Sequence, residues 1–180
     1  MFKRFSKESG FTIFELLVVI FIIGLLSSGV LLSYRKSKRL YALNQSAHQL
    51  ISDLRKAQNM ALSGVDINET TQYCGYGIVI DYGPRPTSYY LYADKNNNCD
   101  TSNNKYTPSD TLIKEIVLSN QTTLDEVTPD LDIYFKSPDP TTYINQDASV
   151  GVSGTITLKV LGSETTKTIT VTTAGLIQKN

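Results

Sequence analysis

The chain has 180 residues, with 17 basic and 17 acidic side chains and a formal net charge of +0. This length suits one domain plus an anchor rather than two domains, and the balanced charge does not favour a nucleic-acid-binding protein, which is usually basic. Trp is absent while 11 Tyr residues are present. Together with many Thr, Ser and Asn residues, this composition is typical of an exported β-rich domain with polar sheet faces.

A short basic segment, residues 1–10, precedes a continuous apolar run. The run from Phe11 to Leu32 has 22 residues and a single charge, Glu15. About 20 helical residues cross the hydrocarbon core of a bilayer, so residues 11–32 are predicted to form a transmembrane helix. A carboxylate in mid-membrane costs roughly 2.5–3.5 kcal/mol on insertion scales, so it is normally kept for a purpose and has a partner.

This N-terminal pattern resembles the type IV prepilin signature of pilins and secretion pseudopilins. Gly10, Phe11, Thr12, Glu15 and the apolar run 16–20 carry the resemblance. It implies that a prepilin peptidase cuts between Gly10 and Phe11 and that the new Phe11 amine is methylated. It also implies that Glu15 neutralises the N-terminal amine of a neighbouring subunit during assembly, because a charge pair in lipid offsets the desolvation of each group.

The leader, residues 1–10, also predicts the orientation of the anchor. Lys3, Arg4 and Lys7 hold it on the cytoplasmic side of the inner membrane. The small residue Gly10 stands before the apolar run, whereas an ordinary secretory signal places small residues after it. Cleavage there would leave the run on the mature protein and the remaining chain in the periplasm or outside the cell. A plain signal anchor with a stray carboxylate is the alternative.

An amphipathic continuation of the helix is predicted over residues 33–64. Apolar residues recur at the i, i+3, i+4, i+7 spacing; they are Leu40, Leu43, Ala47, Leu50, Ile51, Leu54, Ala57 and Ala61. No proline occurs before Pro84, and Gly64 is a natural stop after residue 62. We expect the apolar stripe to pack on a β-rich globular domain spanning residues 65–180.

Four basic residues follow the apolar run: Arg35, Lys36, Lys38 and Arg39. We interpret them as a solvated face near lipid headgroups rather than a ligand site, although their charge opposes the positive-inside rule. His48 is the only histidine. A lone histidine is rarely catalytic, since catalysis needs partners within hydrogen-bond reach. No Ser–His–Asp spacing, His-rich metal motif or glycine-rich phosphate loop is present, so the sequence predicts no enzyme.

Beyond residue 72 the apolar period shortens to two, which predicts strands. The expected strands are 77–82, 88–93, 112–118, 131–136, 154–161 and 167–173, with a short last strand within 175–178. The first two and the last two long strands flank turn residues and predict hairpins. Segments 107–110 and 137–142 are expected to be surface turns, and 145–153 a loop. The predicted class is α+β and pilin-like: one long helix, transmembrane in its first half, packed on antiparallel sheets.

This order of elements extends the resemblance to the FimT/GspH group of minor pseudopilins. The matching parts are the helical segment 46–64, the strand start Gly75-Tyr76-Gly77 and the terminal hairpin before Gly175. Major pilins often have a proline near the position of Leu32. Its absence here favours a minor subunit.

The two cysteines, Cys74 and Cys99, are expected to form a disulfide. Folding the first hairpin about a turn near Arg85 places Cys74 opposite a residue near Asn97. An exported domain lies in an oxidising compartment where disulfides persist. Closing a loop of about 25 residues adds roughly 3 kcal/mol in the chain-entropy model. Two free thiols are the alternative.

Oxygen-bearing side chains alternate along one loop, at Asp94, Asn96, Asn98 and Asp100. This is the first half of an EF-hand calcium loop. The second half departs from that pattern, because the required glycine and bidentate glutamate are absent. The alternative is a turn whose Asn and Asp side chains hydrogen-bond the backbone.

The sequence therefore predicts a non-enzymatic minor pilin or pseudopilin of a type II secretion pseudopilus or type IV pilus. Its expected partners are other pilin subunits, the prepilin peptidase/methyltransferase and inner-membrane lipid. One alternative is a DNA-binding subunit of a competence pilus, which needs a basic surface patch; Lys159, Lys167 and Lys179 are the candidates. Another is an anchored adhesin or calcium-binding module, and an anchored hydrolase ranks last.

Overall fold

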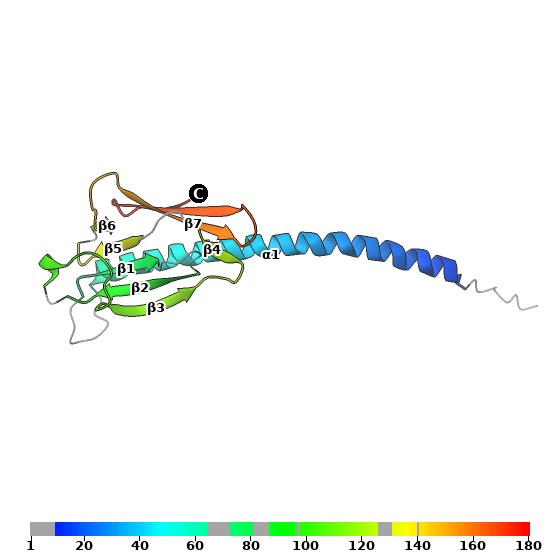
Figure 1. The fold of residues 1–180 in the computed structure, drawn as a ribbon, viewed down its shortest axis with the longest axis horizontal. Helices are drawn as coiled ribbons and strands as arrows, with labels where there is room; N and C mark the ends of the chain where they lie inside the picture. Colours follow the sequence, from blue (N-terminus) through cyan, green and yellow to red (C-terminus); the bar gives the residue numbers. More distant parts are fainter. Residues whose placement is uncertain (1–9, 65–72, 81–86, 97, 126–130, 140) are drawn as a thin grey trace, which may run out of the picture. The chain divides into compact units, whose positions relative to one another are not determined.

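The computed structural model describes residues 10–64, 73–80, 87–96, 98–125, 131–139 and 141–180, apart from the side chains of residues 30–33. The chain divides into two compact units, Met1–Lys38 and Arg39–Asn180. A single long helix, α1 (Ile13–Ser63), supplies residues to both units (Figure 1). The first unit is helical wherever it is described beyond Thr12, and the second unit contains the β-strands.

The bounds of α1 agree with the predicted continuous helix. No proline interrupts it, and it ends at Ser63, directly before Gly64. Gly64 has a φ of 56°, and its amide donates to the carbonyl of Ala61 over 3.3 Å. A residue with positive φ just after the last helical turn is a common helix end, and glycine adopts it without strain from a Cβ. Gly64 is therefore the stop that the sequence predicts.

The predicted apolar stripe of α1 lies in the core of the second unit. Its buried members are Leu43, Ala47, Leu50, Leu54, Ala57 and Ala61. At its edges Ile51 is half-buried, and Leu40 keeps 37% of its surface exposed. The helix is also tied to the sheet by a polar contact, because the buried Tyr89 hydroxyl donates to Asp53 Oδ2 over 2.7 Å.

The strands of the second unit form two antiparallel sheets. They are β1 (Gly75–Ile80), β2 (Ser88–Asp94), β3 (Thr111–Val117), β4 (Thr122–Leu124), β5 (Asp132–Lys136), β6 (Thr142–Ile144), β7 (Ser153–Val160), β8 (Thr166–Thr172) and β9 (Ile177–Lys179). The five-stranded sheet has the order β3-β2-β1-β5-β6, and the four-stranded sheet has the order β4-β7-β8-β9. Every pair is antiparallel.

Both sheets and α1 share one hydrophobic core. It contains Ile78, Leu91 and Phe135 from the first sheet and Leu158 and Val171 from the second, together with the buried stripe of the helix. In Figure 1 the cyan part of α1 runs along β1 and β2. The described architecture is the expected α+β class, one helix packed on antiparallel sheets, and is consistent with a pilin-like fold.

The six long predicted strands are present, and their described bounds differ from the predicted ones by at most two residues. Residues 81–82 of the first predicted strand and the turn near Arg85 lie outside the described residues. Short strands β4 and β6 were not predicted. Thr142, which the sequence predicts at the end of a surface turn, begins β6 and is 0% exposed. A three-residue strand is too short to display an alternating pattern, and its identity depends on a partner elsewhere in the chain. The last strand is Ile177–Lys179 rather than one within 175–178.

Candidate functional site

The junction between Gly10 and Phe11 lies directly before the start of α1. Both residues are outside the helix and exposed, Phe11 by 78%. Thr12 Oγ1 accepts a hydrogen bond from the amide of Glu15 over 3.2 Å, and the Thr12 carbonyl accepts from the amide of Leu16 over 3.1 Å. Thr12 is therefore the N-cap that satisfies one of the free amides of the first turn.

Glu15 occupies the first turn of the helix. The spacing of Thr12 and Glu15 is that of a capping box, in which both residues serve the free amides of the helix start. A carboxylate here also interacts favourably with the positive end of the helix dipole. The local sequence thus starts the helix two residues after the predicted scissile bond and places Glu15 in its first turn.

The first part of α1 has an apolar surface that no other described residue of the first unit buries. Every described side chain from Gly10 to Gly29 is exposed. Among the described residues one helix, α1, is long and apolar enough to cross a membrane, and none of its most apolar 18-residue window is buried. Soluble proteins rarely expose contiguous apolar areas of this kind. Length, composition and exposure together indicate membrane anchoring.

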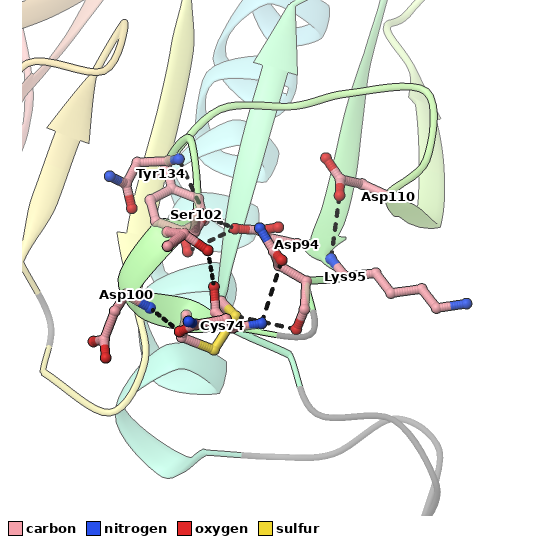
Figure 2. The surroundings of a disulfide bond; sticks show 12 residues. Cys74, Asp94, Lys95, Asp100, Ser102, Asp110 and Tyr134 are labelled. Atoms are coloured by element: carbon pink, nitrogen blue, oxygen red, sulfur yellow. Dashed lines mark hydrogen bonds between the residues drawn. A yellow bond between two sulfur atoms is a disulfide. The ribbon is translucent and has the colours of Figure 1, made fainter.

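The second unit contains the expected disulfide between Cys74 and Cys99 (Figure 2). Its Cα atoms lie 5.0 Å apart, within the range of ordinary disulfides. The register differs from the predicted one. Gly75 pairs with Asp94, so Cys74 is level with Lys95 instead of a residue near Asn97. Cys99 approaches Cys74 because the chain turns through a short 3-10 helix, η1 (Cys99–Thr101).

The four residues predicted as calcium ligands differ in burial and in hydrogen-bond partners. Asp94 is buried and accepts hydrogen bonds from the hydroxyls of Ser102 and Tyr134, the latter over 3.0 Å (Figure 2). Asn96 Oδ1 accepts from the amide of Asn98 over 3.3 Å, and Asn98 Oδ1 accepts from the amide of Asp100 over 3.0 Å. These are the backbone-directed bonds of an Asn/Asp-rich turn.

Within the described ranges no group of three or more His, Cys, Asp or Glu side chains is placed to hold a metal ion. Asp100 is exposed, and its amide donates a hydrogen bond to Asn98 Oδ1, which caps the N-terminus of η1. Calcium binding at Asp94, Asn96, Asn98 and Asp100 therefore stays a prediction.

Two tyrosine–aspartate pairs cross β1 on the face of the first sheet opposite to α1. The Tyr92 hydroxyl on β2 donates to Asp132 Oδ1 on β5 over 2.7 Å. The Tyr134 hydroxyl on β5 donates to Asp94 on β2 over 3.0 Å. We call these four residues the crossed pairs. Tyr92, Asp94, Asp132 and Tyr134 are all buried.

Glycines in β1 make room for the two rings. A Cβ built on Gly77 would lie 2.6 Å from ring atoms of Tyr92, and one built on Gly75 would collide with the end of the Tyr134 ring. Each tyrosine therefore lies over a glycine of the intervening strand to reach the aspartate on its far side. This explains why glycine occupies positions 75 and 77, because any larger residue there would occupy the space of a tyrosine ring.

Residues 98–110, between β2 and β3, form a loop that covers the crossed pairs. Its Ser102 hydroxyl bonds Asp94, and its Tyr106 amide donates to Asp132 Oδ2 over 2.6 Å. The Tyr106 ring contacts the Tyr92 ring edge-on, with ring centres 5.1 Å apart. The disulfide at Cys99 joins this covering loop to the start of β1.

Burial sets the electrostatics of the two aspartates. It raises the pKa of Asp132 to about 6, although the hydrogen bonds from Tyr106 and Tyr92 act in the opposite direction. Burial also raises the pKa of Asp94, against the hydrogen bonds from Ser102 and Tyr134. Removing a carboxylate from water disfavours its charged form. The crossed pairs are therefore a buried, hydrogen-bonded polar cluster that titrates above the usual range of aspartate.

The crossed pairs are not among the features that the sequence predicts. A signal was present, because Tyr92 and Asp94 are two residues apart, as are Asp132 and Tyr134, so each pair shares one face of its strand. What the sequence lacked was the information that β1 lies between β2 and β5.

The basic residues near the C-terminus are partly engaged. Lys159 Nζ forms an ion pair with Glu164 Oε2 at 2.9 Å. Lys179 Nζ lies 3.3 Å from Nε2 of the exposed His48. The ion pair lowers the net positive charge that this region could offer to a polyanion.

The N-terminal segment matches a known family model. Residues 5–31 match the prokaryotic N-terminal methylation motif. No curated protein and no solved structure matches the chain. The matched range contains the Gly10–Phe11 junction, the capping residue Thr12, Glu15 and the exposed apolar part of α1. The N-terminal segment of the chain is therefore similar to that of type IV prepilins, and this similarity supports membrane anchoring through α1.

Proposed function

We propose that the chain is a minor pilin or pseudopilin subunit of a type II secretion pseudopilus or a type IV pilus. The observation that carries the proposal is the coincidence of the methylation motif, at residues 5–31, with an exposed apolar helix. The role is structural: a membrane-anchored precursor is processed and then inserted into a filament with other subunits. The resemblance of the helix, the Gly75-Tyr76-Gly77 strand and the terminal hairpin to the FimT/GspH group belongs to this proposal.

Processing is proposed to break the peptide bond between Gly10 and Phe11. The junction lies outside the helix, and Gly10 and Phe11 are exposed, so a peptidase can reach it. Cleavage frees the Phe11 amine, which is then methylated. The mature chain keeps the apolar part of α1 because the cut precedes it.

Assembly is proposed to depend on the apolar helix and on Glu15. A carboxylate in an apolar environment is costly unless it has a partner, and the new amine of a neighbouring subunit supplies the opposite charge. Contacts between apolar helices supply the remaining attraction. The β-rich unit would then lie in the periplasm or outside the cell, where its disulfide is stable.

The proposal is tested by separating processing from assembly in cells that make a prepilin peptidase. Gly10→Val places a branched side chain at the cleavage position and is expected to leave the leader on the chain. Glu15→Gln keeps the size of the side chain but removes its charge. It is expected to be cleaved normally and to fall at least tenfold in sheared filaments. Leu16→Ile, next to Glu15, is the matched control and should behave as wild type.

Two results would contradict the proposal. An uncut wild-type chain beside a peptidase that cleaves another prepilin in the same cells would remove the processing step. Equal filament content for wild type and Glu15→Gln would remove the assembly role of Glu15. The competence-pilus alternative would instead be favoured if the chain bound DNA in a salt-dependent way and lost this binding when Lys167 and Lys179 were substituted.

A further inference from the structure

A band of positive charge follows the apolar part of α1 within the first unit. Arg35, Lys36 and Lys38 are all exposed, and the preceding Tyr34 exposes 65% of its surface. At about 100° per residue the three cations cover roughly half of the helix circumference. We call Tyr34, Arg35, Lys36 and Lys38 the basic band.

The basic band has no acidic residue near it in the sequence. No Asp or Glu occurs between Glu15 and Asp53. Among the described residues the ion pair present is that of Lys159 with Glu164, far along the chain from the band. Three adjacent cations without a carboxylate repel one another and favour an external source of negative charge.

The position of the band relative to the apolar run indicates what that source is. The helical part of the apolar run, from Ile13 to Leu32, is 20 residues, or about 30 Å of helix, which matches the hydrocarbon thickness of a bilayer. The basic band then lies at the level of the lipid headgroups on the side opposite the leader. Tyrosine is enriched at this level because its ring is apolar and its hydroxyl polar.

We infer that the basic band binds the headgroups of anionic phospholipids and so fixes the depth and tilt of the anchor before assembly. Each cation near an anionic surface strengthens association about fivefold, from a contribution of about 1 kcal/mol. The inference goes beyond the proposed pilin role, because it requires only that the apolar run spans a membrane. It also accounts for cations that oppose the positive-inside rule: at this position they bind lipid instead of setting orientation.

The test measures which lipid surrounds the full chain in a membrane. The full-length protein is reconstituted into mixed vesicles with spin-labelled phosphatidylglycerol or phosphatidylcholine, and electron spin resonance gives the relative association of each. We expect wild type to prefer phosphatidylglycerol. R35Q/K36Q should lower this preference at least twofold, and 1 M NaCl, where the screening length is about 3 Å, should also lower it.

The chain supplies a matched control with the same charge change. R55Q/K56Q also removes one Arg and one Lys, both exposed on α1 but in the second unit. It should leave the phosphatidylglycerol preference unchanged. The leader cations are present in every variant, so they cancel in the comparison.

Three outcomes would overturn the inference. One is an equal loss of preference in R35Q/K36Q and R55Q/K56Q, which would show a general charge effect. A second is no preference for phosphatidylglycerol in wild type at low salt. A third is short duplex DNA bound by chains in neutral vesicles with the same dependence on Arg35 and Lys36, which would assign the band to nucleic acid. None of these measurements involves cleavage, so each can fail while the pilin proposal stands.

Discussion

The hydroxyl of Tyr92 on β2 donates a 2.7 Å hydrogen bond to Asp132 on β5, although β1 separates the two strands. The contact is possible because the intervening strand has a glycine under the ring. Tyr134 and Asp94 repeat the arrangement in the opposite direction. The crossed pairs therefore bind three strands into one unit through side chains as well as backbone.

Gly77→Ala tests the crossing directly. The added methyl group would lie 2.6 Å from the ring of Tyr92, so the ring must move and its bond to Asp132 must lengthen or break. We expect a loss of about 2–4 kcal/mol in the free energy of unfolding, as for overpacking combined with a lost buried hydrogen bond. Urea unfolding of the full chain in detergent measures it. Gly24→Ala, where nothing lies within 4 Å of the added carbon, is the control; equal stability of the two variants would contradict the crossing.

The buried Asp132 predicts that the protein is more stable in mild acid. Its folded-state pKa of about 6 lies above the value of about 3.9 expected for an unfolded chain, so the folded state binds the proton more tightly. Stability should therefore increase as the pH falls from 7 to 5, by about 1 kcal/mol from this group. The raised pKa of Asp94 acts in the same direction.

Asp132→Asn should flatten this pH dependence even if it changes the overall stability. Asp147→Asn is the control, because the pKa of Asp147 is lowered by its hydrogen bonds to Ser149 and it titrates below this window. Unfolding midpoints at pH 5, 6 and 7 provide the measurement. A wild-type protein whose stability falls steadily from pH 7 to pH 5 would contradict the assignment.

Removal of the disulfide should weaken the second unit as a whole. Cys74 and Cys99 are 25 residues apart, and opening a loop of that length costs about 3 kcal/mol in the chain-entropy model. Cys74→Ser/Cys99→Ser and the reduced wild type should therefore lose similar amounts of stability in urea. A variant as stable as the oxidised protein would show that the crossed pairs and the core hold the covering loop without the bridge.

Asn98 provides a test of the calcium prediction. Its side chain caps η1 by accepting from the amide of Asp100 over 3.0 Å. Loss of such a cap in Asn98→Ala should cost about 1 kcal/mol. We expect the same cost in EGTA and in millimolar calcium. A cost that appears only with calcium would instead establish Asn98 as a ligand.

The sequence predicted those features that depend on local pattern. The bounds of α1 follow from apolar residues that recur at helical spacing and from the helix stop at Gly64. The hairpin of β7 and β8 follows from strict alternation of apolar and polar residues on both sides of Gly162. The disulfide was predicted from the compartment and from hairpin spacing, and it is present although the register differs by two residues.

Features that depend on contacts between distant segments were not predicted. Tyr92 and Asp132 are 40 residues apart, and only the strand order places their strands on opposite sides of β1. Likewise Thr142 is buried because β6 pairs with β5, whereas its neighbours Pro138 and Pro140 indicate a turn. Burial at such positions depends on strand pairing within the sheet, so the local sequence pattern does not predict it.

The central proposal is that a prepilin peptidase cuts this prepilin-like chain between Gly10 and Phe11, so that the mature chain begins two residues before α1 starts at Ile13. Intact mass and N-terminal sequencing of the full chain, expressed with an active prepilin peptidase and purified without reductant, test it most directly. We expect residues 11–180 with one added methyl group on Phe11 and two hydrogens fewer for the Cys74–Cys99 bond. A chain that still begins at Met1, beside a control prepilin that the same peptidase has cut, would contradict the account.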